Sequence, residues 1–121
     1  MAYDFVKFLG NYPRGDNKIS IQKSGLIRLS PGFCRETGIK SFRYVILFYD
    51  GSNRAIAFKF TNVNQAGALK VTKDRNSATI SAKSFIKANN LDLRSFLGRY
   101  NWKKQEISGI GEVFIVELGK K

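Results

Sequence analysis

The sequence predicts a mainly β protein with two short helices, an α+β chain in which two similar halves form one barrel-like domain. Three observations predict this class. Short alternating or β-branched runs are separated by turn residues. The order strand, strand, helix, strand, strand occurs over residues 18–60 and again over residues 69–118. A chain of 121 residues with 43% hydrophobic side chains can bury one core without disulfides, so we expect residues 1–121 to form a single domain.

The first half begins with a hairpin and a helix. Residues 18–23 alternate apolar and polar side chains, and a Ser-Gly turn leads into an apolar strand at residues 26–29. Ser30 is a typical N-cap, Pro31 suits the first helical position, and Gly38 is typical of a helix end. A short helix is therefore predicted between them.

A second hairpin completes this half, with strands at residues 42–49 and 54–60 around an Asp-Gly-Ser-Asn turn. The first of these strands is apolar on both faces, which is typical of a strand covered on both sides. Residues 61–68 are small and polar, and we expect them to connect the two halves.

The second half repeats this order. Strands at residues 69–72 and 78–81 form a hairpin, and Ser81 is predicted to cap a helix over residues 82–90. Two further strands follow at residues 99–104 and 112–118. Pairing the halves into a closed barrel would remove exposed strand edges. An α+β domain without an internal repeat fits the same elements, because the two halves share few identical residues.

The charge of the chain points to a polyanionic partner. Lysine and arginine number 21 against 9 acidic residues, which gives a formal net charge of +12. Residues 1–60 and residues 61–121 each carry +6, so the charge belongs to the folded body and not to a tail. A compact domain tolerates such self-repulsion most often because it binds nucleic acid. A protein that is basic only for solubility or because of its source is the alternative.

Cysteine and histidine usage argues against secretion and catalysis. Cys34 is the single cysteine and the chain has no histidine, so no intramolecular disulfide can form and no imidazole can activate the thiol. Residues 1–10 lack the apolar core of a leader peptide, and the longest apolar run, residues 45–49, is too short to span a membrane. We expect a cytoplasmic protein that is not an enzyme, holds no cofactor or metal and does not bind a membrane.

A family resemblance adds to this interpretation. The matching positions lie between residues 19 and 60 and are Ile19-Ser20, Lys23-Ser24-Gly25, Ile27, Leu29, Phe33, Gly38-Ile39, Val45 and Asp50-Gly51. With these residues the segment resembles the AbrB and MraZ swapped-hairpin DNA-binding proteins. The resemblance implies DNA binding and transcription regulation. It also implies a barrel completed either by a homodimer or, as in the MraZ type, by two copies within one chain.

Basic residues at turns, helices and strands are the candidate binding residues. Lys83 and Lys87 lie one helical turn apart, where an anion would relieve their repulsion. The helix starts at Ser30 and Ser81 have no neighbouring carboxylates and are predicted to accept phosphate. The full set predicted to bind nucleic acid is Lys23, Arg28, Arg35, Lys73, Arg75, Lys83, Lys87, Arg99, Lys103 and Lys104.

Tyr100 and Trp102 alternate with Arg99, Asn101 and Lys103 and leave two alternatives open. If they are exposed, the two rings can stack on unpaired bases of single-stranded DNA or RNA. If they are buried, the polar face alone contacts duplex phosphates. Alternation favours burial, and with it a double-stranded DNA-binding regulator or architectural protein. The alternatives are a single-stranded DNA or RNA binder and a basic structural or assembly subunit of a virion or ribonucleoprotein.

Overall fold

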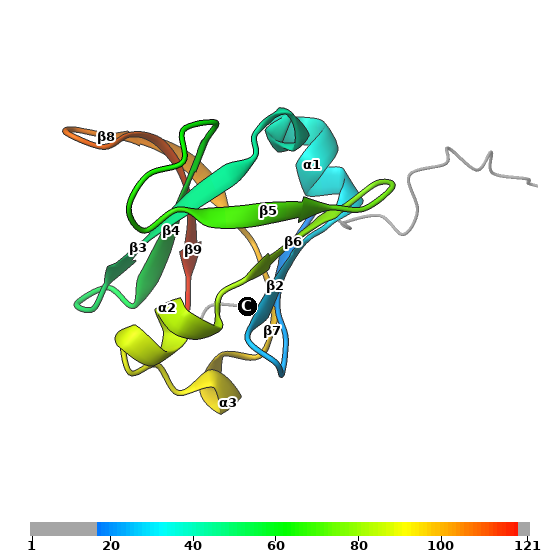
Figure 1. Ribbon diagram of the computed structural model, residues 1–121. Helices are drawn as coiled ribbons and strands as arrows, with labels where there is room; N and C mark the ends of the chain where they lie inside the picture. The colour runs from blue at the N-terminus through cyan, green and yellow to red at the C-terminus, as the bar shows by residue number, and fades with distance from the viewer. Residues whose placement is uncertain (1–16, 119–121) are drawn as a thin grey trace, which may run out of the picture.

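The computed structural model describes residues 17–118 (Figure 1). Residues 1–10, in which no leader peptide is predicted, lie outside this range. The described chain is mostly β, with three short α-helices and nine strands in one curled antiparallel sheet. The mainly β class is therefore confirmed, with one α-helix more than the two predicted.

Strands and helices follow one another in short segments. The strands are β1 (Ile19–Ile21), β2 (Leu26–Leu29), β3 (Tyr44–Asp50), β4 (Ala55–Thr61), β5 (Leu69–Lys73), β6 (Ala78–Ser81), β7 (Gly98–Tyr100), β8 (Lys103–Ile107) and β9 (Gly111–Glu117). The helices are α1 (Pro31–Thr37), the 3-10 helix η1 (Ile39–Ser41), α2 (Lys83–Ala88) and α3 (Leu93–Phe96).

The sheet curls, and its two edge strands follow one another directly in the chain. Its strand order is β7-β1-β2-β6-β5-β3-β4-β9-β8, and every neighbouring pair is antiparallel. The edge strands β7 and β8 are separated in the chain only by Asn101 and Trp102, a link that spans at most about 11 Å. The sheet therefore has two walls. Strands β7, β1, β2, β6 and β5 form the first wall, and β3, β4, β9 and β8 form the second wall.

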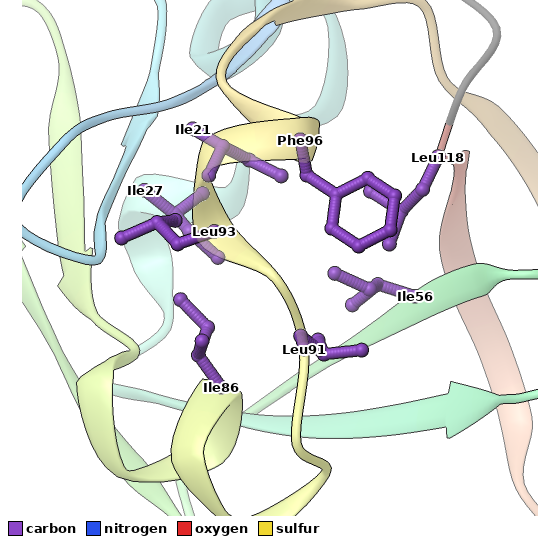
Figure 2. Close-up of a pocket in the computed structure, with 8 residues that line it drawn as sticks. All are labelled: Ile21, Ile27, Ile56, Ile86, Leu91, Leu93, Phe96 and Leu118. Atoms are coloured by element: carbon purple, nitrogen blue, oxygen red, sulfur yellow. The ribbon is translucent and has the colours of Figure 1, made fainter.

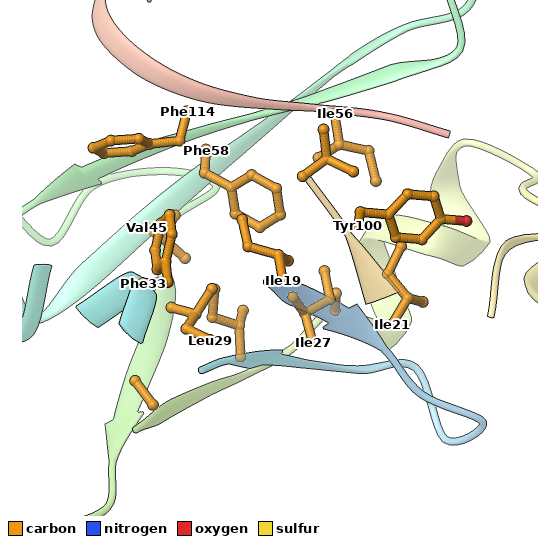
Figure 3. Packing of buried hydrophobic residues seen from close by; sticks show 14 of the residues in the cluster. Ile19, Ile21, Ile27, Leu29, Phe33, Val45, Ile56, Phe58, Tyr100 and Phe114 are labelled. Carbon is orange, nitrogen blue, oxygen red and sulfur yellow. The ribbon is translucent and has the colours of Figure 1, made fainter. Parts of the chain in front are cut away.

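The hydrophobic core lies between the two walls (Figure 3). Alternation along the strands points Ile19, Ile27 and Leu29 of the first wall and Ile56 and Phe58 of the second wall inward. These side chains are at most 2% exposed. Burying each of them stabilises the fold by about 1.5–3 kcal/mol.

An aromatic cluster connects α1 to the link between β7 and β8. The ring of Phe33 in α1 lies 4.9 Å from that of Trp102 and 5.4 Å from that of Phe114, edge-on in both contacts. Phe60 lies 5.9 Å from Phe114. Each such pair adds about 0.5–1.5 kcal/mol beyond its buried area. The cluster therefore holds α1 against the second wall and the link between β7 and β8.

The signals that predict α1 are confirmed. Ser30 caps the helix, because its Oγ accepts the Phe33 N–H at 3.4 Å, and Pro31 occupies the first turn. Gly38 follows the last turn with a φ of 68°, a left-handed conformation that glycine adopts without strain.

The predicted start of the second helix is wrong. Ser81 is the last residue of β6, and Ala82 occupies the N-cap position without a side-chain hydrogen bond. The buried Ala82 instead donates its N–H to the Gly25 carbonyl at 3.0 Å. Contact with the β1–β2 turn, and not a serine cap, therefore determines where α2 begins. Helix α2 also ends before residue 90, and the unpredicted α3 follows Asp92.

The predicted strand at residues 99–104 is divided in two. β7 ends at Tyr100 on the first wall, and β8 begins at Lys103 on the second wall. Between them, the Nε1 of the partly buried Trp102 donates to the Asn17 carbonyl at 2.6 Å. The chain therefore crosses between the walls where one strand is predicted. The internal repeat of residues 18–60 and 69–118 stays a prediction.

Candidate nucleic-acid interface

A row of polar side chains crosses the outer face of the first wall. Alternate residues of its five strands point into the core, and the register therefore sets Arg99, Ser20, Arg28, Thr79 and Thr72 side by side on the other face. Neighbours in such a row have Cβ atoms about 4.5–5.5 Å apart. None of these five described strands contains Asp or Glu. The outer face of the first wall thus has two arginines and no carboxylate of its own strands.

Two lysines outside the predicted set extend this surface. Lys70 is exposed and lies two residues before Thr72 on β5. Lys18 lies two residues before Ser20, and its Nζ donates to Asn101 Oδ1. A spacing of two puts residues on the same face of a strand, and this is the signal by which the sequence identifies both lysines.

The β5–β6 turn and α1 lie at one end of the first wall (Figure 1). The Lys40 Nζ donates to the carbonyls of Asp74 and Arg75, at 3.0 and 2.8 Å, and so holds the turn beside η1. The side chains of Arg35, Lys73 and Arg75 are exposed on these elements. Three predicted residues therefore lie at this end, with Lys40 as an addition and Asp74 and Glu36 as acidic neighbours.

The opposite end carries cations from α2 and the β1–β2 turn. Gly25 has a φ of 82°, and a Cβ built on it would lie 3.2 Å from the Lys83 Cα, so the turn packs directly on the first residue of α2. Lys23, Lys83 and Lys87 are exposed on these adjoining elements. No acidic residue occurs in the turn, in β6 or in α2. The three lysines thus lie together without a carboxylate from their own elements.

The two lysines of β8 are set apart from these residues. The Nζ of Lys103 lies 3.4 Å from a carboxylate oxygen of Glu117, and that of Lys104 lies 3.7 Å from one of Glu112. Both ion pairs join β8 to β9 on the second wall. The structure therefore brings eight of the ten predicted residues to the first wall and its ends, and leaves out Lys103 and Lys104.

Of the two alternatives for Tyr100 and Trp102, the structure agrees with burial, which the alternation favours. Tyr100 is 1% exposed, and its hydroxyl donates to the Phe96 carbonyl at 2.8 Å. Trp102 is partly buried, and its ring packs against Phe33 and Phe114. Both rings belong to the core, as the alternation favours, and they leave no stacking platform on β7.

The two helix starts differ in their exposure. At α1, Ser30 is 2% exposed, and Gly32 and Phe33 in the first turn are buried, so the core covers much of this turn. At α2, Ser81 ends β6 and provides no cap, and a phosphate site at this helix start stays a prediction.

The described residues also bear on metal binding, thiol reactivity and ligand binding. No three His, Cys, Asp or Glu side chains among residues 17–118 lie close enough together to hold a metal ion. Burial raises the pKa of the Cys34 thiol, whose Sγ donates to the Leu29 carbonyl at 3.6 Å, so the thiol is a structural group. A pocket beside α2 and α3 has an entirely apolar lining, which gives a substrate no polar contact (Figure 2). Its lining residues are Ile21, Ile27, Ile56, Ile86, Leu91, Leu93, Phe96 and Leu118.

Comparison with known proteins adds no relative. No protein-family model matches the chain, and no curated protein and no solved structure matches it significantly. Within residues 17–118, none of the helices has the length and apolar character needed to cross a bilayer. The candidate interface therefore rests on the geometry of the chain itself.

Proposed function

We propose that the protein is a double-stranded DNA-binding protein, a transcriptional regulator or an architectural protein, without enzymatic activity. The observation that carries this proposal is the gathering of eight predicted cations on the first wall, whose strands contain no carboxylate, and at its two ends. Each lysine or arginine that neutralises a phosphate releases condensed counterions, and this release drives association.

Duplex DNA suits this surface better than an unpaired strand. Binding of single strands depends on exposed aromatic rings that stack on bases, and Tyr100 and Trp102 are held in the core. The first wall instead presents charged and hydroxyl side chains such as Arg28 and Thr79 on a sheet. Groups of this kind contact phosphate and sugar oxygens along both backbones of a duplex.

A barrel of two similar halves is part of the proposal, and the strand pairing supports it. Hairpins β1–β2 and β5–β6 correspond to each other, as do β3–β4 and β8–β9. Between the halves, β2 pairs with β6 and β4 pairs with β9. Exchanging the halves therefore turns each hairpin into its counterpart and leaves the β2–β6 and β4–β9 pairs as they are, as an internal two-fold axis requires. The remaining pairs are β5–β3 and β1–β7, and β7 leads directly into β8.

Local details also repeat at a constant distance along the chain. Gly38 and Asn90 end the first and second helix with positive φ, 68° and 54°, and lie 52 residues apart. The Thr37 side chain donates to the carbonyl four residues earlier, and so does that of Asn89, again 52 residues further on. Helix α1 begins two residues after β2 ends, and α2 begins two residues after β6 ends. The same offset of 52 residues therefore relates β2 to β6, the start of α1 to the start of α2, and Gly38 after α1 to Asn90 after α2.

These repeats support the resemblance to the two-copy MraZ type of the AbrB and MraZ proteins. In that arrangement one chain supplies a whole barrel, so DNA binding needs no homodimer. A cytoplasmic location completes the proposal, because Cys34 is a free thiol, as is usual in a reducing compartment.

The salt dependence of duplex binding tests the proposed function. In a fluorescence anisotropy titration, we expect the affinity for duplex DNA to fall steeply between about 50 and 200 mM salt, with a log–log slope of roughly −0.9 for each phosphate contacted. Single-stranded DNA and RNA of the same length, measured in parallel, should bind more weakly. Equal affinity for the duplex at low and high salt, or tighter binding of a single strand, contradicts the proposal.

A further inference from the structure

We infer that one chain contacts a duplex through two matched sets of cations, one at each end of the first wall, related by the internal two-fold axis. The inference rests on the proposed DNA binding. It adds that the contacted phosphates lie symmetrically on the two strands of the duplex.

The cations themselves repeat at the offset of 52 residues. Lys23 in the β1–β2 turn corresponds to Arg75 in the β5–β6 turn, and Arg35 in α1 corresponds to Lys87 in α2. All four side chains are exposed. Few residue types repeat between the halves, yet the positive charge repeats at these positions. The two halves therefore carry a positive charge at two corresponding positions, while Asp74 and Glu36 add carboxylates at one end only.

Each turn packs against a helical segment of the other half. The β1–β2 turn lies on α2, through the close approach of Gly25 to Lys83. The β5–β6 turn lies on η1, directly after α1, through the two hydrogen bonds from Lys40. Each end of the first wall thus combines a turn cation from one half with a helix cation from the other: Lys23 with Lys87 at one end and Arg75 with Arg35 at the other.

The β2–β6 ladder separates the two ends. It runs from the pair Leu26 and Ser81 to the pair Leu29 and Ala78, about 10 Å at 3.3 Å per residue. The turns and helices extend beyond it, which puts the two sets on the order of 20–30 Å apart. One turn of B-DNA is about 34 Å long, so a single chain can reach phosphates on both strands within one turn. Arg28 lies in the ladder, between the two ends.

Matched substitutions at the two ends test the inference. We compare Lys23→Gln with Arg75→Gln on a duplex of about 16 bp, long enough for one helical turn and a half. At about 0.1 M salt, one lost phosphate contact corresponds to roughly an eightfold loss of affinity and a change of about 0.9 in the salt slope. We expect each variant to show this loss, and the double variant to show the product of the two. Arg35→Gln and Lys87→Gln form a second matched pair with the same expectation.

The controls separate this inference from the proposed function. Lys104→Gln removes one charge from the ion-paired hairpin of β8 and β9 and should leave the affinity within about twofold of wild type. One chain per short duplex is expected from sedimentation or light scattering of the complex. A loss at one end only, or two chains per duplex, overturns the two-fold contact and leaves DNA binding intact. Absence of salt-dependent duplex binding by the unmodified chain overturns both.

Discussion

The first wall and the β8–β9 hairpin carry the same kind of side chain in opposite settings. On the first wall, Arg28 and Arg99 share a row with hydroxyl residues, and no strand contributes a carboxylate. On the hairpin, Lys103 and Lys104 face Glu117 and Glu112 across the strand pair. Local basic character is therefore a poor guide to a binding surface, because the partner strand decides whether the charge is already neutralised.

The largest expected difference in duplex affinity is found by reversing one charge on the first wall and one on the β8–β9 hairpin. Arg28→Glu removes one phosphate contact, roughly eightfold at 0.1 M salt, and the new carboxylate repels phosphate by a similar factor, so we expect a loss on the order of 50-fold. Lys104→Glu, with the same change in net charge, should lose no more than about threefold. Anisotropy titrations with one duplex measure both variants.

The interpretation of this pair needs a check on folding. Thermal unfolding followed by circular dichroism shows whether each variant keeps its sheet, and Arg28→Gln replaces Arg28→Glu if the reversed charge unfolds the chain. Equal losses for the two reversals would break the comparison, because they would mean that net charge alone governs binding.

A smaller effect on duplex affinity is expected when Lys103 and Lys104 lose the carboxylates that pair with them. Glu112→Gln with Glu117→Gln removes both carboxylates that pair with Lys103 and Lys104. The lysines then lie unneutralised on the second wall, away from the proposed interface, and we expect duplex affinity to rise by less than about threefold at 0.1 M salt. A gain of tenfold or more would show that only the ion pairs keep this hairpin from binding DNA.

Local signals predicted one half of the fold better than the other. The cap at Ser30 and the left-handed Gly38 act within a few residues, so α1 could be placed from the sequence alone. The start of α2 depends on a hydrogen bond from Ala82 to Gly25, which lies far away in the sequence. The division of β7 from β8 depends likewise on the hydrogen bond from Trp102 to Asn17. Contacts between distant segments leave no pattern in the local sequence from which these boundaries could be predicted.

The residues of the candidate site divide in the same way, into those that the local sequence identifies and those that only contacts between distant segments bring in. Exposed turn and helix cations such as Lys23, Arg75 and Lys87 could be selected from the sequence, because turns and polar helix faces lie at the surface. The pairing of Lys104 with Glu112 could have been suspected only once the register of β8 and β9 was known. Lys40 joins the site through carbonyls of the β5–β6 turn, and no spacing along the chain indicates that contact.

The smallest effect on duplex affinity is expected in the β3–β4 turn of the second wall. There the carboxylate of Asp50 accepts hydrogen bonds from residues of the same turn. The Asp50 carboxylate accepts the Asn53 side-chain amide at 2.8 Å and the backbone N–H groups of Asn53 and Ser52 at 3.2 and 3.1 Å. These hydrogen bonds, that of the Asn53 side chain above all, hold the pKa of Asp50 below its ordinary value of 3.8. The ionised form is thus favoured by folding.

The contribution of this turn to stability is therefore complete above the ordinary pKa of Asp50 and is lost as the pH falls through the lower value in the folded protein. In an NMR titration we expect the Asp50 carboxyl and the Asn53 amide to titrate together, with a midpoint below 3.8. Asn53→Ala should raise that midpoint toward 3.8 and leave duplex affinity at neutral pH unchanged, because the turn belongs to the second wall. A change in affinity would place this turn at the DNA and remove the distinction between the two walls.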